Sequence, residues 1–218
     1  GKGKTVLMDN WFNRETKTDA FGRKIVFHYK WWERDNGGFS FLSHIFNKHG
    51  AITTLLDEPP SETSLKNASV YFLVDPDWPK ENKTPNYIEQ SHIHELYNYV
   101  KKGGVLVLMA NDSNNVEFEN FNKLAARFGI KFNQNMRHDV IDNRFEQGAL
   151  FFDEADAIFG KVKKVFIKQI CTQTLSKPAL RVHRENNEVL ISYTRIGKGT
   201  VFAVGDPWFY NEYVDGRK

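Results

Sequence analysis

Residues 101–115, KKGGVLVLMANDSNN, decide the fold. Two glycines precede six consecutive apolar residues, Val105 to Ala110, and Asn111 and Asp112 end the run. A short apolar run without polar alternation, bounded by turn-forming residues, is typical of a strand that is covered on both faces of its sheet. Ligands of open α/β sheets bind beyond the carboxyl ends of such strands. We therefore expect Asn111 and Asp112 to lie on the floor of any site.

The pattern of an apolar strand followed by an amphipathic helix repeats on both sides of this stretch. The expected strands are Thr5–Asn10, Ala51–Leu56, Val70–Val74, Val105–Ala110 and Gly129–Phe132. The expected helices lie between Gly38 and Gly50, from Glu62 to Asn67, from Tyr87 to Lys102, and from Phe118 to Phe128. This alternation predicts an α/β fold, a flavodoxin-like doubly wound and mainly parallel sheet with helices on both faces.

The remaining segments are two long excursions and a β-rich last third. The excursions run from Asn13 to Asn36 and from Asn133 to Asp156. The last third has strand patterns at Lys164–Thr172, Glu188–Arg195 and Thr200–Val204, and the last two are joined by Gly197-Lys198-Gly199. This turn predicts a C-terminal antiparallel hairpin, which we place at the edge of the sheet.

Composition limits the classes of protein to which the chain can belong. With 218 residues, 40% of them hydrophobic, we expect a single domain over 1–218. The formal net charge is +3 and the basic residues are scattered, so we expect no nucleic-acid partner. No apolar run approaches the roughly 20 residues that span a bilayer. Cys171 is the only cysteine, which excludes an intramolecular disulfide. We expect no cofactor.

Several predicted strands end on acidic or amide residues. Such side chains hydrogen-bond sugar hydroxyls, and tryptophan supplies a flat apolar face, so a shared rim would suit a carbohydrate; a hard cation is a second use of the same oxygens. The candidate rim consists of Asp9, Asn10, Trp11, Trp31, Asp75, Asp77, Asn111, Asp112, Asp206 and Trp208. The alternative is purely structural, since Asp and Asn at strand ends are also ordinary turn and cap residues.

The usual nucleophile patterns are missing. The turn after the central strand, Met109 to Ser113, has neither a GxSxG nor a GxCxG frame. Cys171 lies in a strand-like alternation, where a small buried thiol is expected. His92 and His94 are two residues apart on a predicted helix and therefore point to different sides. We assign no catalytic residue and no metal ligand.

Long segments of the chain resemble a known family. They are VLMDNWFN, GGFSFLSHIFNKHGA, VYFLVDPDWPKENKTPNYIE, YVKKGGVLVLMANDSNNVEFENFNKLAARFGI and GKGTVFAVGDPWFYNEY. Together they are similar to the C-terminal domain of unsaturated rhamnogalacturonyl hydrolases of Bacteroidetes, glycoside hydrolases of the unsaturated glucuronyl type. The resemblance implies a class I glutamine amidotransferase-like fold, a periplasmic or secreted location, and an upstream helical-toroid hydrolase domain as partner.

The resemblance implies an accessory domain of a pectin-degrading enzyme, cut from a longer chain. The catalytic residues of that family belong to the toroid, and none can be carried over. Where amidotransferases have a nucleophilic cysteine, this chain has Asn111 and Asp112. Three hypotheses follow: a module that binds carbohydrate or packs on the hydrolase domain, a hydrolase using Asp9, Asp75 and Asp112 as acid, base or metal ligands, and a structural spacer.

Overall fold

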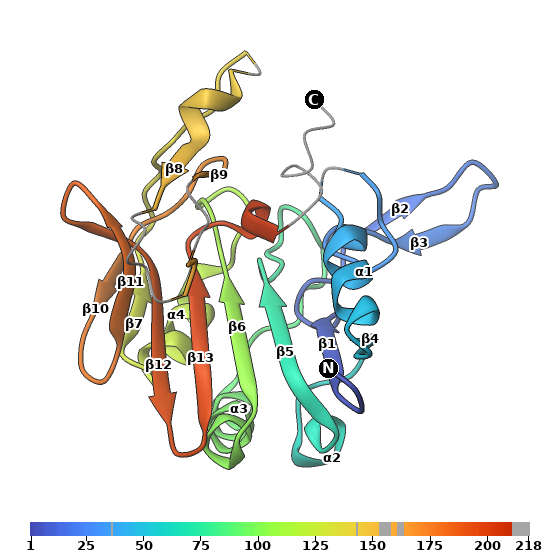
Figure 1. The fold of residues 1–218 in the computed structure, drawn as a ribbon. Helices are drawn as coiled ribbons and strands as arrows, with labels where there is room; N and C mark the ends of the chain where they lie inside the picture. Colours follow the sequence, from blue (N-terminus) through green and yellow to red (C-terminus); the bar gives the residue numbers. More distant parts are fainter. Residues whose placement is uncertain (36, 143, 153–157, 161–163, 211–218) are drawn as a thin grey trace.

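The computed structural model describes residues 1–35, 37–142, 144–152, 158–160 and 164–210. A single large sheet forms the middle layer, and other elements cover both of its faces (Figure 1). The order of the strands is β4-β1-β5-β6-β13-β12-β10-β7, and β11 pairs with β12. Their bounds are β1 Thr5–Asp9, β4 Ile52–Leu56, β5 Ala68–Val74, β6 Val105–Met109, β7 Ile130–Phe132, β10 Gln173–Leu175, β11 Leu180–Glu185, β12 Glu188–Ile196 and β13 Gly199–Val204.

The strands from β4 to β13 in this order run parallel to one another. The central strand predicted from Val105 is β6, and all but its first residue are buried. Its lack of alternation follows from packing on both faces, because each face of the sheet has its own hydrophobic cluster. The α/β class and the parallel block are therefore confirmed.

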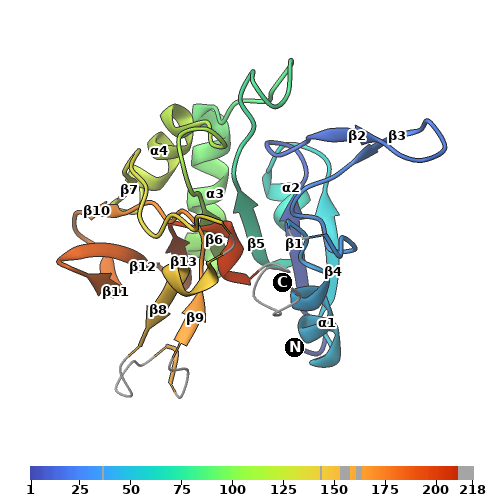
Figure 2. The same cartoon turned by 90° about the horizontal axis from the view of Figure 1, so that it is seen from above.

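Helices cover one face, and a mixed layer covers the other (Figure 2). The first layer consists of α2 (Glu62–Leu65), α3 (Gln90–Lys102) and α4 (Phe118–Ala126), which contribute Leu65, Leu96 and Phe121 to one cluster. The second contains α1 (Ser40–Lys48) and the short helices η1 (Phe145–Gly148) and η2 (Pro207–Tyr210). The helix that precedes β6 ends at Gly103, whose φ of +123° favours glycine. None of the described helices is long and apolar enough to cross a membrane.

Two expectations about the last strands need correction. The β12–β13 hairpin is present, but β13 lies inside the sheet, between β6 and β12. The strand β7, expected to extend the parallel block, pairs antiparallel with β10 at the far end of the sheet. Hydrophobic alternation identifies a strand but carries no information about its partner, because pairing is decided by segments far away in the sequence.

Both excursions contain hairpins that protrude from the sheet (Figure 1). The first holds β2 (Thr16–Thr18) and β3 (Lys24–Val26), which pair antiparallel. The second leads into β8 (Ala149–Phe151), which pairs with β9 (Lys164–Phe166). The ends of the predicted excursions, at residue 36 and at residues 153–156, lie outside the described residues.

Candidate functional site: the carboxyl-end rim of the sheet

The parallel strands bring the polar strand ends to one edge of the sheet. Val74, Met109 and Val204 are neighbours in register, so Asp75, Asn111 and Asp206 follow on the same side. The strand order reverses between β1 and β5, the position at which ligands of open α/β folds bind. The polar ends of these three strands therefore lie along one edge of the sheet.

Asp9 is buried and its carboxyl group organises the turn after β1. It accepts hydrogen bonds from the backbone N–H groups of Phe12 and Asn13 at 2.9 and 2.8 Å, and from the Tyr71 hydroxyl at 2.6 Å. Burial raises the pKa of Asp9, and these hydrogen bonds oppose the shift. The adjacent Asn10 is also buried, and its side-chain amide donates to Asp57. Both side chains hold neighbouring chain segments.

Asp75 occupies the floor of the rim in a left-handed backbone conformation, with φ of +35°. Its carboxyl accepts from the Tyr29 hydroxyl at 2.7 Å and from the Asn111 N–H at 3.3 Å. Burial raises the pKa of Asp75 well above its usual range, and the nearby Asp206 and Asp112 raise it further. An outlying backbone angle on a buried polar residue is a common feature of functional sites.

The remaining strand-end residues are hydrogen-bonded within the fold. Asp112 accepts from the Asn114 N–H at 2.7 Å, and Asn111 accepts from the N–H of Asp112 at 2.7 Å. Asp206 accepts from the N–H groups of Lys168 and Trp208 at 2.7 and 2.8 Å. All three side chains are buried; Asn111 and Asp112 bond within their own turn, whereas Asp206 also joins its turn to a residue 38 positions earlier in the chain.

The three tryptophans of the predicted rim differ in exposure. Trp31 is only 6% exposed; its ring lies edge-on against Phe39, Phe46 and Phe72 in the core, and its indole N–H donates to the Thr54 carbonyl at 2.8 Å. It presents no face to the rim. Trp11 and Trp208 are half-buried, and the Lys168 ammonium lies 5.1 Å from the Trp208 ring centroid.

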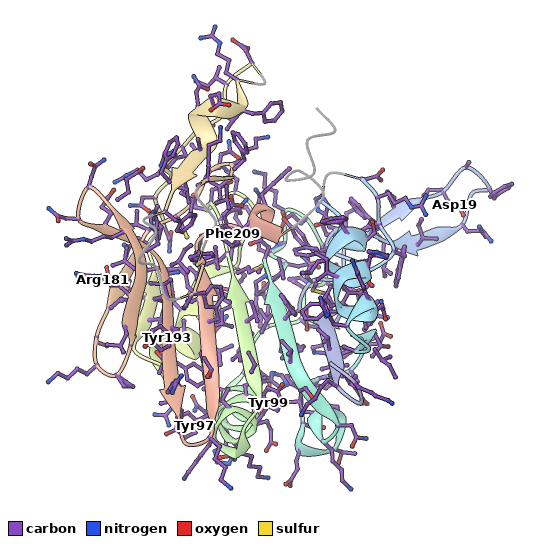
Figure 3. The ribbon with its side chains drawn as sticks, in the orientation of Figure 1. Asp19, Tyr97, Tyr99, Arg181, Tyr193 and Phe209 are labelled. Atoms are coloured by element: carbon purple, nitrogen blue, oxygen red, sulfur yellow. The ribbon has the colours of Figure 1, made fainter. Side chains whose placement is uncertain are left out.

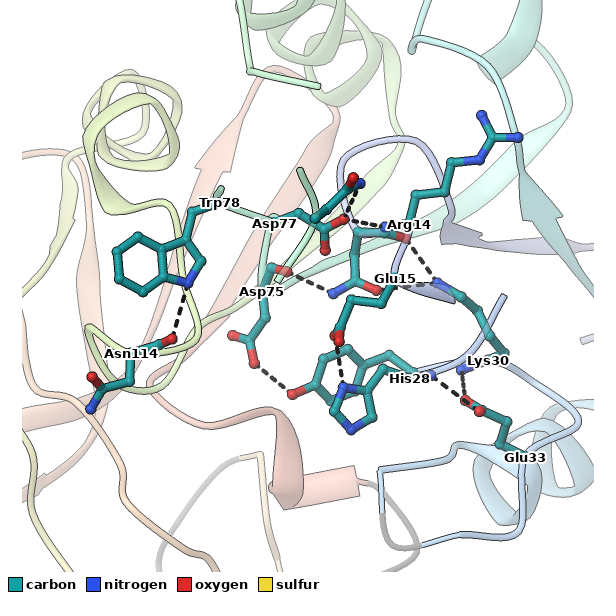
Figure 4. Close-up of polar contacts among 12 residues, drawn as sticks. Arg14, Glu15, His28, Lys30, Glu33, Asp75, Asp77, Trp78 and Asn114 are labelled. Carbon is teal, nitrogen blue, oxygen red and sulfur yellow. Dashed lines mark hydrogen bonds and ion pairs between the residues drawn. The ribbon is translucent and has the colours of Figure 1, made fainter. Parts of the chain in front are cut away.

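A buried lysine that the sequence does not single out connects the base of the first excursion to the rim (Figure 4). Lys30 is fully buried and donates to the backbone carbonyl and side-chain oxygen of Asn13 at 2.9 and 3.2 Å. Asn13 in turn donates to the Asp75 carbonyl at 2.7 Å. Burial lowers the pKa of Lys30 to about 8, although Asp9 and Asp77 oppose the shift.

Further carboxyl groups with raised pKa values, those of Asp77 and Glu81, lie in the loop after β5. Asp77 accepts from the Arg14 N–H and the Asn82 amide, each at 2.9 Å, and its Oδ1 has no partner among the described residues. Burial raises the pKa of Asp77 to about 6. Burial, aided by Glu15, Asp75 and Asp77, raises the pKa of Glu81 to about 9. Such clustering of perturbed carboxyls marks a candidate site.

A groove of about 440 Å³ opens beside the rim, between the loop after β5 and the start of α4. It is lined by Trp78, Pro79, Tyr87, Ser113, Val116, Glu117, Phe118, Glu119, Asn120 and Gln134. The Trp78 indole N–H donates to the Asn114 carbonyl at 3.0 Å, which fixes the ring beside the β6–α4 turn (Figure 4). None of these residues belongs to the rim predicted from the sequence; Tyr87 and Phe118 were expected only as the first residues of helices.

The cysteine and histidine side chains considered as nucleophiles or metal ligands make contacts within the fold. The Cys171 thiol is buried 3.2 Å from the Ala110 carbonyl oxygen, and burial raises its pKa well above its usual range. His92 accepts from the Glu89 N–H at 3.1 Å, and His94 contacts Asn98 at 2.8 Å. Across residues 1–35, 37–142, 144–152, 158–160 and 164–210, no three His, Cys, Asp or Glu side chains are placed to hold a metal ion together.

No family model and no curated protein matches the sequence. Solved structures do match. The mmIFT52 N-terminal domain has a TM-score of 0.70 at 16% identity, over 99% of this chain and 91% of that one. The cytoplasmic protein STM1381 from Salmonella typhimurium LT2 has 0.60 at 12%, over 93% and 87%. A putative ThuA-like protein from Bacteroides uniformis ATCC 8492 has 0.50 at 11%, over 99% and 86%.

A β-galactosidase from Bacillus circulans sp. alkalophilus also matches, with a TM-score of 0.55 at 10% identity over 96% of this chain and 30% of that one. At these identities the likenesses show the fold alone. The likeness to the ThuA-like protein agrees with the coarse α/β class that the sequence predicts. This class, a mixed α/β domain around a largely parallel sheet, is what the fold and the comparisons define.

Proposed function

We propose that this domain is a non-catalytic carbohydrate-binding module of a polysaccharide-degrading glycoside hydrolase. The observation that carries the proposal is the groove beside the rim, where the Trp78 and Tyr87 rings lie close to polar side chains that can bind hydroxyl groups. Pectin and rhamnogalacturonan fragments are the first candidates as ligands, from the family resemblance. A periplasmic or secreted location belongs to the same proposal.

The chemistry of the groove suits a sugar ring. Trp78 is half-buried, with the Lys80 ammonium 5.5 Å from its ring centroid, and Tyr87 is 43% exposed, so both rings are partly open to solvent. Sugar rings have apolar C–H faces that pack on aromatic rings, and their hydroxyls need donors and acceptors around them. Ser113, Asn120 and Gln134 line the same groove and supply both.

The strand-end carboxyls support a binding role over a catalytic one. Asp9, Asp75 and Asp112 would have to serve as acid, base or metal ligands in the hydrolase hypothesis, and each is buried and hydrogen-bonded within the fold. A glycosidase needs two carboxyl groups that both face the scissile bond. The match to a segment covering 30% of a β-galactosidase is compatible with a domain of this fold serving within a longer glycosidase chain.

Calorimetric titration with rhamnogalacturonan and homogalacturonan oligosaccharides tests the proposal. Removing one stacking ring, in Trp78→Ala or Tyr87→Ala, should weaken binding about fivefold or more, taking as a guide the stacking of a nucleic-acid base on an aromatic ring, which contributes on the order of 1–3 kcal/mol. The matched control is Trp32→Ala, which removes an indole that is 57% exposed outside the groove. It should bind like the wild type.

Two outcomes would contradict the proposal. One is the absence of heat at millimolar concentrations of every oligosaccharide, which removes the sugar-binding role. The other is equal weakening by Trp32→Ala, which would place the sugar elsewhere. If the domain then still co-purified with a helical-toroid hydrolase domain, its role would be to pack on that domain and not to bind sugar.

A further inference from the structure

A second cavity, of about 660 Å³, lies at the opposite end of the sheet from the rim. It surrounds the amino ends of β1, β5 and β6, between α2 and α3, where Figure 3 labels Tyr99. Its apolar lining comes from both hydrophobic clusters and includes Val6, Phe46, Leu65, Val70, Tyr99 and Val105. Its volume lies within the range of about 300–1,000 Å³ that is typical of binding sites for small molecules.

Small residues line this cavity at the strand starts. Ala68 and Ser69 begin β5, and Gly103 and Gly104 precede β6. A Cβ at Gly104 would lie 2.2 Å from the Tyr99 ring, so only glycine lets that ring pack against the chain there. The ring is held by a hydrogen bond from its hydroxyl to the Val105 carbonyl at 3.3 Å. The cavity thus has a fixed wall.

The mouth of the cavity carries more positive than negative charge. Its charged side chains are Lys4, Lys66 and Lys102 against Glu62 and Glu95. Lys102 forms an ion pair with Glu62 across the gap between α3 and α2. Lys4 and Lys66 are exposed, so their flexible stems can lie on apolar surface while the ammonium groups reach a bound anion.

We propose that this cavity binds an amphipathic anion, an apolar body with a single anionic head group. The apolar lining would take the body, and Lys4 and Lys66 would face the head group. This inference does not rest on the carbohydrate-binding proposal, because none of the residues that line the groove at Trp78 lines this cavity.

Displacement of the fluorescent probe 1-anilinonaphthalene-8-sulfonate by dodecanoate, below the micellar range, tests the inference on the full chain. Dodecanoate should displace the probe, and dodecyltrimethylammonium should do so at least tenfold less well. Lys4→Glu and Lys66→Glu should each weaken dodecanoate at least fivefold. Lys83→Glu, an equal charge reversal on an exposed lysine of the loop after β5, is the control and should leave the affinity unchanged.

Ser69→Trp provides an independent test. A large ring at the start of β5 should fill the cavity and abolish displacement of the probe by dodecanoate, while sugar binding at the rim persists. Equal displacement by the cationic amphiphile would overturn the inference, and so would an equal effect of Lys83→Glu or the absence of any displacement. Loss of sugar binding in Trp78→Ala with normal displacement by dodecanoate would separate the two sites.

Discussion

Asp75 combines three properties that rarely occur in one residue: full burial, a left-handed backbone angle, and a carboxyl group with a raised pKa. Its partner Tyr29 lies 46 residues earlier in the chain, in the first excursion. The strand pattern around Val74 predicts the end of β5, but it cannot predict that a distant loop returns to cover the carboxyl. Burial of a polar strand end is therefore decided by tertiary packing.

Removal of the Tyr29 hydroxyl should destabilise the fold. In Tyr29→Phe the Asp75 Oδ2 atom loses its 2.7 Å hydrogen bond and remains buried, so we expect a loss of about 1–3 kcal/mol in the free energy of unfolding. Denaturant unfolding monitored by circular dichroism measures the loss. Tyr193→Phe, at a half-buried position of β12, is the control and should change the stability by less. Equal losses in the free energy of unfolding would show that the Tyr29–Asp75 hydrogen bond stabilises the fold no more than the hydroxyl of Tyr193 does.

The buried Lys30 should make stability depend on pH. Its pKa is about 8 in the fold, against 10.5 for an ordinary lysine. The unfolded chain therefore binds more protons between these values, and the free energy of unfolding rises with pH across this window. Below pH 8 the unfavourable contribution is fully present.

Lys30→Met isolates this contribution, because methionine keeps the length of the side chain without its charge. From pH 8 to 10.5 the wild type should gain on the order of 2 kcal/mol of stability relative to the variant. Chemical denaturation of both proteins across this range measures the difference, and the titration of other groups cancels. A difference that stays constant with pH would show that Lys30 titrates normally.

At the scale of elements, the β2–β3 hairpin projects from the sheet and contributes little to either core. All residues of β2 are exposed, and the turn is held by the Asp19 carboxyl, which accepts from the N–H groups of Phe21 and Arg23 at 2.8 and 2.9 Å. The base of the same excursion is buried through Tyr29 and Lys30. Only the base of the first excursion therefore packs on the fold.

Replacement of residues 16–26 with a two-glycine linker should therefore leave the domain folded. The Phe27 N–H already donates to the Glu15 carbonyl at 3.1 Å, so the ends of the excision are close. We expect Tm to fall by less than about 4 °C, the shift that corresponds to roughly 1 kcal/mol in a domain of this size. Differential scanning calorimetry measures Tm. A larger fall would show that the hairpin packs against the sheet.

At the scale of the whole molecule, the elements of the parallel block could be predicted and their partners in the second half could not. The strands β1, β4, β5 and β6 and the helices between them follow from periodicity, since each buries a face that its own sequence displays. The interior position of β13 depends on pairing with β6, which ends 90 residues earlier. The exposed residues of β11 follow no regular alternation, and its sequence shows no clear period either.

The same limit applies to the candidate site. The polar strand ends meet at one edge as expected, because parallel strands share a direction. Lys30 and Glu81 were not predicted as site residues, because they lie in loops without periodicity. Tyr87 was expected to begin the helix that ends at Lys102, but it lies in the loop before α3, where it lines the groove. Trp31 was predicted at the rim and lies in the core, since a tryptophan in a loop gives no sign of the direction in which its ring points.

The central position of β13 also determines the order in which the chain can acquire structure. During synthesis β6 leaves the ribosome long before its second neighbour exists, so its outer row of N–H and C=O groups stays unpaired over the whole intervening segment. A nascent chain in this state offers an apolar, strand-shaped template to other chains. Slow translation or a premature stop before residue 199 would therefore expose the cell to aggregates of an otherwise well-formed half-sheet.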